Sequence, residues 1–258
     1  MTQLPVALRS PISLPEGRAG KFQVRHRMEQ TFDVISMREG LLTGQMPKRI
    51  KTTESICIHE LHHDEHGLWI ADLPIEIRQH KEALTRMWTH GRVLVGGLGL
   101  GIAATLLAKM PQVEAIDVVE ISPEVAELCD PHHPKVNVIV KDLHKFLTET
   151  KWKWDSAFID IWLGTNEGAW WENVFPIRRL IGQRFGKWHA DRVVYWAEDI
   201  MLGQVGMRLM ATPATPHWYY KEGLRLPMSK QRARWVIQNV GTPLWEKRYG
   251  ALYPKETP

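Results

Sequence analysis

The stretch from Arg92 to Glu120 constrains the fold of this chain more than any other part of the sequence. It begins with the apolar run Val93-Leu94-Val95, which is short enough for a strand buried on both faces of a parallel sheet. A glycine-rich turn (GGLGLG), a segment of helical character (IAATLLAKM) and a second apolar strand (AIDVVE) follow in that order. This order predicts two parallel strands joined through a tight turn and a covering helix.

The glycines, together with the acid that ends the second strand, indicate a binding site for a nucleoside-containing ligand. Glycine adopts a positive φ without strain and lets a ligand approach the bare backbone. The first turn of the helix offers unpaired N–H groups to electron-rich atoms. An acid at the end of the next strand, here Glu120, suits two ribose hydroxyls. The alternative is a glycine turn that is required only for packing.

Three of the glycines, Gly97, Gly99 and Gly101, form a G-x-G-x-G pattern directly after the first strand. This pattern resembles the first motif of the class I S-adenosylmethionine-dependent methyltransferases. An apolar residue at Val95, followed by Gly-Gly, is more similar to the spermidine synthase (aminopropyltransferase) branch of that superfamily. The later motifs occur in the family's order up to Trp162, and HKEAL faintly resembles the Y-H-E segment of the synthases. The resemblance implies S-adenosyl-L-methionine as the cofactor.

The resemblance also implies roles for residues at the ends of successive strands. Glu120 matches the ribose-binding acid, Asp142 the acid that holds the adenine amino group, and Asp160 the acid beside the reacting end of the cofactor. Asp160 is therefore the expected catalytic residue, as a base for an amine or as the partner of the cofactor ammonium. The expected cofactor-binding residues are Gly97, Leu98, Gly99, Gly101, Glu120, Ile121, Asp142, Leu143, Asp160 and Trp162.

Departures from the synthase pattern favour methyl transfer over aminopropyl transfer. Spermidine synthases have an aspartate where this chain has Leu100, and a tyrosine where it has His80. They also have Asp-Ser and a proline-rich loop after the fourth strand, where this chain continues with 161–165 (IWLGT). The leading interpretation is a methyltransferase that acts on a small molecule or a protein side chain. An aminopropyltransferase-like enzyme, another transferase or lyase using the same cofactor, and a non-catalytic binding module are the alternatives.

The acceptor site is expected at two places near the reacting end. One is the helix that precedes the first core strand, and the other is the glycine- and tryptophan-rich segment 163–175. Residues 160–163 (DIWL), directly after the fourth strand, lack the prolines of a D/N-P-P-Y motif, which argues against amino-methylation of DNA bases. The expected substrate contacts are Gln79, His80, Asn166, Glu167, Trp170 and Trp171.

The alternation of strands and helices predicts an α/β, Rossmann-like class I methyltransferase fold, mostly a parallel sheet with helices on both faces. A small N-terminal β-extension precedes it, with strands expected in FQVRHR, TFDVISM, SICIHEL and LWIADL, after an irregular arm of about twenty residues. The expected divisions are 1–73 for the arm and extension, 74–211 for the cofactor-binding domain, and 212–258 for a basic, aromatic C-terminal extension.

Composition places few further limits on function. The net charge of +4 over 258 residues is only mildly basic, so a nucleic-acid partner bound by the C-terminal extension is conceivable but not favoured. Nothing approaches the roughly 20 apolar residues of a membrane span. The two cysteines, Cys57 and Cys129, are far apart, which indicates a reducing cytoplasm and neither a disulfide framework nor a cysteine-based zinc site. A homodimer formed through the β-extension is an alternative that the sequence does not decide.

The segment from His59 to His63 satisfies H-E-x-x-H, the pattern of zinc proteases. That chemistry requires both histidines on one face of a helix. Residues 57–61 alternate as a strand does, and 64–67 (DEHG) are typical of a turn, so both histidines belong to a hairpin. On a strand they would lie about 13 Å apart, too far for one metal ion. No metal ligand is therefore expected there.

Overall fold

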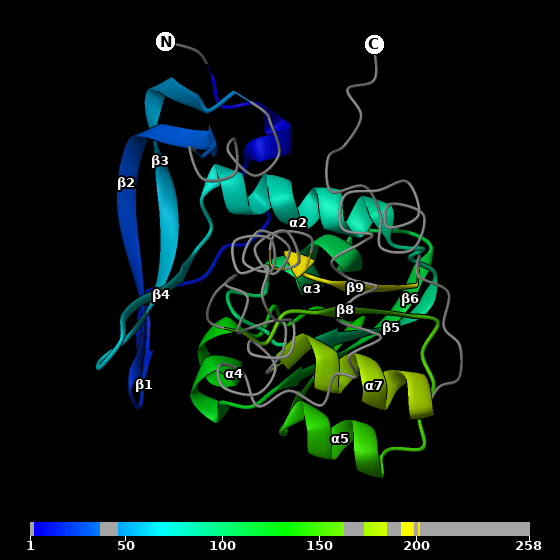
Figure 1. Ribbon diagram of the computed structural model, residues 1–258. Coiled ribbons are helices and arrows are strands. Elements are labelled where there is room, and N and C mark those ends of the chain that lie inside the picture. Colours follow the sequence, from blue (N-terminus) through cyan, green and yellow to red (C-terminus); the bar gives the residue numbers. More distant parts are fainter. Residues whose placement is uncertain (1–2, 37–45, 163–172, 185–191, 199–200, 202–258) are drawn as a thin grey trace, which may run out of the picture.

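The computed structural model describes residues 3–36, 46–162, 173–184, 192–198 and 201 (Figure 1). Its centre is a five-stranded sheet in which all neighbouring strands are parallel, in the order β7-β6-β5-β8-β9. Counted along the chain, the order is 3-2-1-4-5, which is that of a doubly wound nucleotide-binding sheet. The strands are β5 (Gly91–Gly96), β6 (Val113–Glu120), β7 (Val136–Val140), β8 (Ser156–Ile159) and β9 (Val193–Tyr195).

Helices cover both faces of this sheet. In Figure 1, α2 and α3 lie on one face, while α5 and α7 lie together on the opposite face. Two of the short helices begin at a side-chain cap: the Ser122 side chain accepts a hydrogen bond from Val125 N, and Asp142 accepts one from Lys145 N. Within the described residues, no helix is both long and apolar enough to cross a bilayer. The helices are α2 (Pro74–Arg86), α3 (Ile102–Ala108), α4 (Pro123–Cys129), α5 (Leu143–Glu149) and α7 (Phe175–Arg184).

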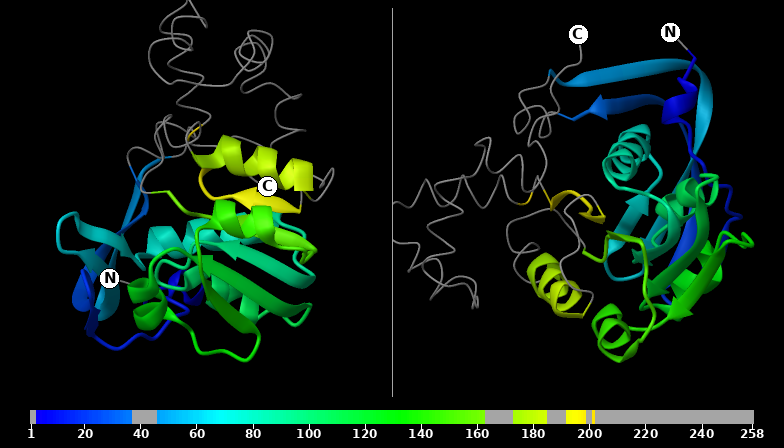
Figure 2. Two further views of the ribbon diagram at one scale, coloured as in Figure 1. Left: turned by 90° about the horizontal axis from the view of Figure 1, so that it is seen from below. Right: turned by 90° about the vertical axis from the view of Figure 1, so that its right-hand side faces the viewer.

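The N-terminal extension is a four-stranded antiparallel sheet in the order β1-β2-β3-β4. Figure 2 shows its long β2–β3 hairpin on one side of the helix-covered sheet, and it packs against α2 and α4. The predicted α/β, Rossmann-like fold with a small N-terminal β-extension is thus confirmed. The strands are β1 (Gly17–Ala19), β2 (Phe22–Ile35), β3 (Lys48–His63) and β4 (Gly67–Ala71).

The strands of this extension differ from the sequence prediction. FQVRHR and TFDVISM were expected as separate strands, but β2 includes the first and continues to Ile35 in the second, because the register with β3 shifts between Glu29 and Thr31 without ending the strand. The N-terminal arm, expected to be irregular, contains β1 and a 3₁₀ turn, η1 (Val6–Leu8). The strand prediction for H-E-x-x-H is confirmed, since His59 and His63 lie on β3 and residues 64–66 form the turn to β4.

One hydrophobic core joins the extension to the parallel sheet. Val24 and Leu61 are fully buried and belong to the same cluster as Val95 and Leu100. The extension is therefore packed onto the sheet near the glycine turn. The division of the chain at residues 73 and 211 stays a prediction.

Candidate functional site

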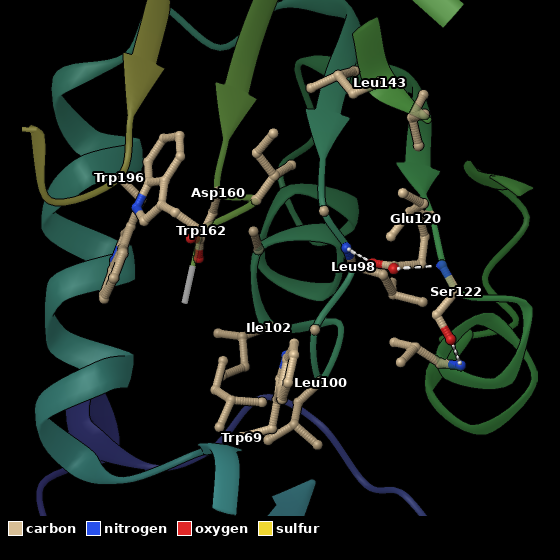
Figure 3. A pocket seen from close by; sticks show the side chains of 18 of the residues that line it. Trp69, Leu98, Leu100, Ile102, Glu120, Ser122, Leu143, Asp160, Trp162 and Trp196 are labelled. Carbon is tan, nitrogen blue, oxygen red and sulfur yellow. Dashed lines mark hydrogen bonds between the residues drawn. The ribbon is translucent and has the colours of Figure 1, made fainter. Parts of the chain in front are cut away.

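A cavity of about 740 Å³ lies outside the carboxyl ends of β5, β6 and β8. This is where ligands bind in doubly wound sheets, because the strand order reverses between β5 and β8. The glycine turn, Glu120, Asp142 and Asp160 all line this cavity, so the three acids predicted at successive strand ends converge on one space. Figure 3 shows Leu98 and Glu120 toward one end, and Asp160 with Trp162 and Trp196 toward the other.

The glycine turn has the backbone that its sequence predicts. Gly97, Gly99 and Gly101 have φ angles of +87°, +52° and +75°, a region that disfavours other residues. The requirement is strictest at Gly97, where a Cβ atom would lie 1.9 Å from the carbonyl oxygen of Asp160. Only glycine lets the β5–α3 turn lie against the end of β8.

Glu120 connects the glycine turn to the β6–α4 turn. The residue is 8% exposed, and its carboxylate accepts hydrogen bonds from Leu98 N (2.8 Å) and from Ser122 N (2.9 Å), one on each oxygen. A carboxylate offers about four lone-pair sites. Glu120 therefore holds both turns in place and retains acceptor capacity for a pair of hydroxyls.

The next part of the wall is formed by the ends of β6 and β7. Asp142 caps α5 by accepting from Lys145 N at 2.9 Å, which fixes its carboxylate at the cavity wall. Leu143 beside it is buried, whereas Ile121 is 68% exposed. An exposed apolar side chain next to a buried one gives this wall a surface on which a planar ring can pack.

Asp160 and His80 face each other at the other end of the cavity. His80 Nε2 lies 3.9 Å from Asp160 Oδ2, which is too long for a direct hydrogen bond. Burial raises the pKa of Asp160 to about 8, and the charge of Glu76 acts in the same direction. Burial lowers the pKa of His80 to about 4, although its hydrogen bond to the carbonyl of Glu76 opposes the change. At neutral pH this end therefore holds a protonated carboxyl and a neutral imidazole.

Two tryptophans enclose the same end. Trp162 is 8% exposed, and its buried Nε1 has no hydrogen-bond partner within the described residues. Trp196 lies beside His80, with ring centroids 5.6 Å apart. Both indole rings line the cavity beside Asp160 and His80.

Most of the predicted site residues within the described residues lie together. Gln79 and Gly101 are not in the cavity lining; Gly101 instead caps α3. Glu198, shortly after β9, is also outside the lining and pairs with Arg178 at 2.6 Å. Asn166, Glu167, Trp170 and Trp171 lie outside the described residues. The predicted residues that line the cavity are His80, Gly97, Leu98, Gly99, Glu120, Ile121, Asp142, Leu143, Asp160 and Trp162.

Sequence reasoning missed the wall that the N-terminal extension contributes. Trp69 and Ile70 of β4 line the cavity, and so does Phe22 of β2. A Cβ atom on Gly99 would lie 3.5 Å from Ile70 Cδ1, which shows how closely β4 approaches the glycine turn. The apolar character of LWIADL was the available signal, but it does not show which surface that strand covers.

No family model and no curated protein matches the sequence. Three solved structures that match are human methyltransferase-like protein 13 in complex with SAH, MtNAS in complex with MTA and tNA, and spermidine synthase from Thermotoga maritima. Their identities are 20%, 18% and 15%, and their TM-scores are 0.32, 0.33 and 0.31. The matches cover 41%, 49% and 55% of this chain, and 59%, 50% and 58% of those chains.

The chain therefore spans about half to three-fifths of the length of these proteins. At these identities and TM-scores the matches do not indicate a substrate or an activity. The class of fold follows instead from the sheet itself, whose strand order and two helix layers are those of a doubly wound, Rossmann-like α/β fold.

Proposed function

We propose that this protein binds S-adenosyl-L-methionine and transfers its methyl group to a small molecule or a protein side chain. The observation that carries the proposal is the convergence of the glycine turn with Glu120, Asp142 and Asp160 on one cavity. A volume of about 740 Å³ lies within the roughly 300–1,000 Å³ of small-molecule sites.

The residues present fit this cofactor. Glu120 keeps lone pairs for two ribose hydroxyls after bonding Leu98 N and Ser122 N. Asp142 accepts from the adenine amino group, while Ile121 and Leu143 pack on the ring. The bare backbone at Gly97 and Gly99 admits the methionine portion, and the Trp162 ring forms a wall near its end.

When bound, the cofactor supplies an electrophilic methyl group for an in-line displacement. The chain's own residues align the acceptor and exclude water, and Trp162 and Trp196 enclose the space beside Asp160. Asp160, in its ionised form, pairs with a cationic amine or takes the proton that an amine nucleophile loses. His80, whose pKa burial keeps at about 4, stays neutral and adds no positive charge against a sulfonium.

Aminopropyl transfer is the second candidate, and one observation favours it. Two carboxyl groups, Glu76 and Asp160, line the same end of the cavity, and Glu76 is close enough to raise the pKa of Asp160. Paired carboxyls suit a polyamine-like acceptor with more than one cationic amine. The chain lacks the synthase aspartate at the position of Leu100 and the synthase loop after β8, and both differences argue against aminopropyl transfer.

Calorimetry and product analysis test both candidates. The purified chain should bind S-adenosylhomocysteine, and incubation with methyl-labelled cofactor and candidate amines should transfer the label. Release of methylthioadenosine from the decarboxylated cofactor, without methyl transfer, would replace the first candidate by the second. If the chain bound neither S-adenosylhomocysteine nor the decarboxylated cofactor, both candidate functions would be refuted. Asp160→Asn should lower turnover more than cofactor affinity; equal losses would make Asp160 a binding group only.

A further inference from the structure

A second group of chemically active side chains lies on the N-terminal sheet, apart from the cavity lining. His26 lies directly opposite His59 in the β2–β3 ladder, and Cys57 precedes His59 by two residues, so all three side chains point to the same face. One ligand atom from each residue lies within 4.8 Å of the other two. Cys57 is a free thiol and half-buried, while His59 is buried.

Each imidazole is oriented by a hydrogen bond at one of its two ring nitrogens. His59 Nδ1 lies 2.7 Å from Asp72 Oδ2, and the same carboxylate accepts His59 N, also at 2.7 Å. His26 Nε2 lies 2.8 Å from the carbonyl oxygen of Leu14. In each bond the ring N–H donates, because a carboxylate and a carbonyl only accept. His59 Nε2 and His26 Nδ1 are the ring nitrogens that these bonds leave available to a metal ion.

This arrangement is the usual outer shell of a metal site, in which a ligating histidine donates its other N–H to a carboxylate or a backbone carbonyl. We propose that His26, Cys57 and His59 bind a divalent transition-metal ion of the zinc class, with a fourth position open to water. Two imidazole nitrogens and one thiolate form a borderline-soft donor set that Zn²⁺ and Co²⁺ both accept.

The geometry requires only a small adjustment of side chains. Tetrahedral coordination at bond lengths near 2.0–2.3 Å puts neighbouring ligand atoms about 3.5 Å apart. In the structure the three ligand atoms lie within 4.8 Å of one another. Rotation about side-chain bonds is enough to bring them closer by the remaining distance of about 1 Å. Unlike the H-E-x-x-H pattern, this group takes its third ligand from the partner strand, where sequence spacing cannot reveal it.

The charges around the thiol favour a cation. Burial, followed by the carboxylates of Asp72 and Glu16, raises the pKa of Cys57, so the metal-free thiol is protonated at neutral pH. Binding breaks the S–H bond, forms the metal–sulfur bond and releases one proton to solvent. The ion would tie β2 and β3 together, and through Leu14 and Asp72 it would fix the arm and the β4–α2 connection.

Cobalt titration of the metal-stripped full chain tests the site. One equivalent of Co²⁺ should give a near-ultraviolet thiolate-to-cobalt charge-transfer band and intense visible bands of tetrahedral geometry. Cys57→Ser should abolish the charge-transfer band, whereas Cys129→Ala, which removes the chain's only other thiol, should leave it unchanged. Competition with Zn²⁺ should bleach both sets of bands, and one equivalent of Zn²⁺ should raise the unfolding temperature of the wild type.

Histidine variants separate this site from ordinary surface binding. His26→Gln and His59→Gln should each weaken Co²⁺ affinity at least tenfold, and Asp72→Asn should do so by about tenfold through His59. His66→Gln is the matched control, because His66 stacks on His63 at the nearby turn and takes no part in the group. A charge-transfer band that survives Cys57→Ser, octahedral bands only, or equal losses in the His66 control would overturn the proposal. Circular dichroism of each variant verifies that the fold is retained.

Discussion

Binding of a cationic cofactor should be coupled to ionisation of Asp160. Without ligand, the pKa of Asp160 is about 8, so the carboxyl is protonated and uncharged at neutral pH. A sulfonium or ammonium group held against it favours the carboxylate and returns the pKa toward its ordinary value. Cofactor binding should therefore release a proton from the protein below pH 8.

The magnitude follows from the pKa alone. At pH 7 a group with a pKa of about 8 is about 0.9 protonated, so close to 0.9 proton should leave per ligand bound if the bound carboxylate is fully ionised. The observed dissociation constant should then be about ninefold lower at pH 7 than at pH 6. His80, with a pKa of about 4, does not titrate in this interval. The amine of the ligand, with a pKa of roughly 7.7–8.0, is mostly charged throughout it.

Calorimetry in buffers of different ionisation enthalpy measures the released protons directly. S-adenosylmethionine and S-adenosylhomocysteine should be compared, because both carry the ammonium but only the former carries the sulfonium. Equal release with the two ligands places Asp160 beside the ammonium, and release with S-adenosylmethionine alone places it beside the sulfonium. Asp160→Asn is the control and should release none. A wild type whose affinity is the same at pH 6 and pH 7, or an unchanged pH dependence in the variant, would refute the coupling.

Three further substitutions test the scaffold of the site. Glu120→Ala should weaken cofactor binding at least tenfold by calorimetry, since a bidentate acceptor of hydroxyls is lost; an unchanged dissociation constant would contradict the ribose assignment. Gly97→Ala should cost more than about 3 kcal/mol of unfolding free energy in urea, because its Cβ would overlap a backbone carbonyl, whereas Gly67→Ala, at φ +72° in open space, should cost only about 1 kcal/mol. Asp117→Asn should cost about 2–4 kcal/mol, because the buried carboxylate accepts from Arg92 and two other side-chain donors. Burial opposes ionisation of Asp117, but these donors lower its pKa overall. Its stabilising contribution is therefore present above pH 4 and lost at lower pH, and the variant should lack that loss in acid-unfolding curves.

The sheet and the acids of the site were predictable because both depend on local order along the chain. Parallel strands joined by right-handed crossovers all end at one edge, so acids that follow successive strands must gather there. Glu120 ends β6, Asp160 directly follows β8, and Asp142 lies two residues after the end of β7. The helix 123–129 was also predictable to the residue, because Ser122 and Pro123 form a cap and a first helical turn.

The extension was less predictable because its strands depend on pairing between distant segments. β2 continues past a register shift after Glu29, but residues 25–31 between its two buried parts include no buried side chain, so no apolar alternation links the two parts in the sequence. The first part of β3, from Lys48, is almost entirely polar and is ordered by pairing with β2 rather than by burial. The His26–Cys57–His59 group arises from the same pairing.

The position of β4 gives the extension a direct part in the site. Trp69 and Ile70 form the wall opposite the sheet, and Ile70 lies against the glycine turn through Gly99. Because Phe22 of β2 packs edge-on against Trp69 at 5.6 Å, movement of the β2–β3 hairpin must displace that wall. The strands that hold the proposed metal group therefore also set the dimensions of the cavity. Acceptor size should depend on the N-terminal sheet as strongly as on the ends of the parallel strands, even though the cofactor motifs lie entirely in the latter.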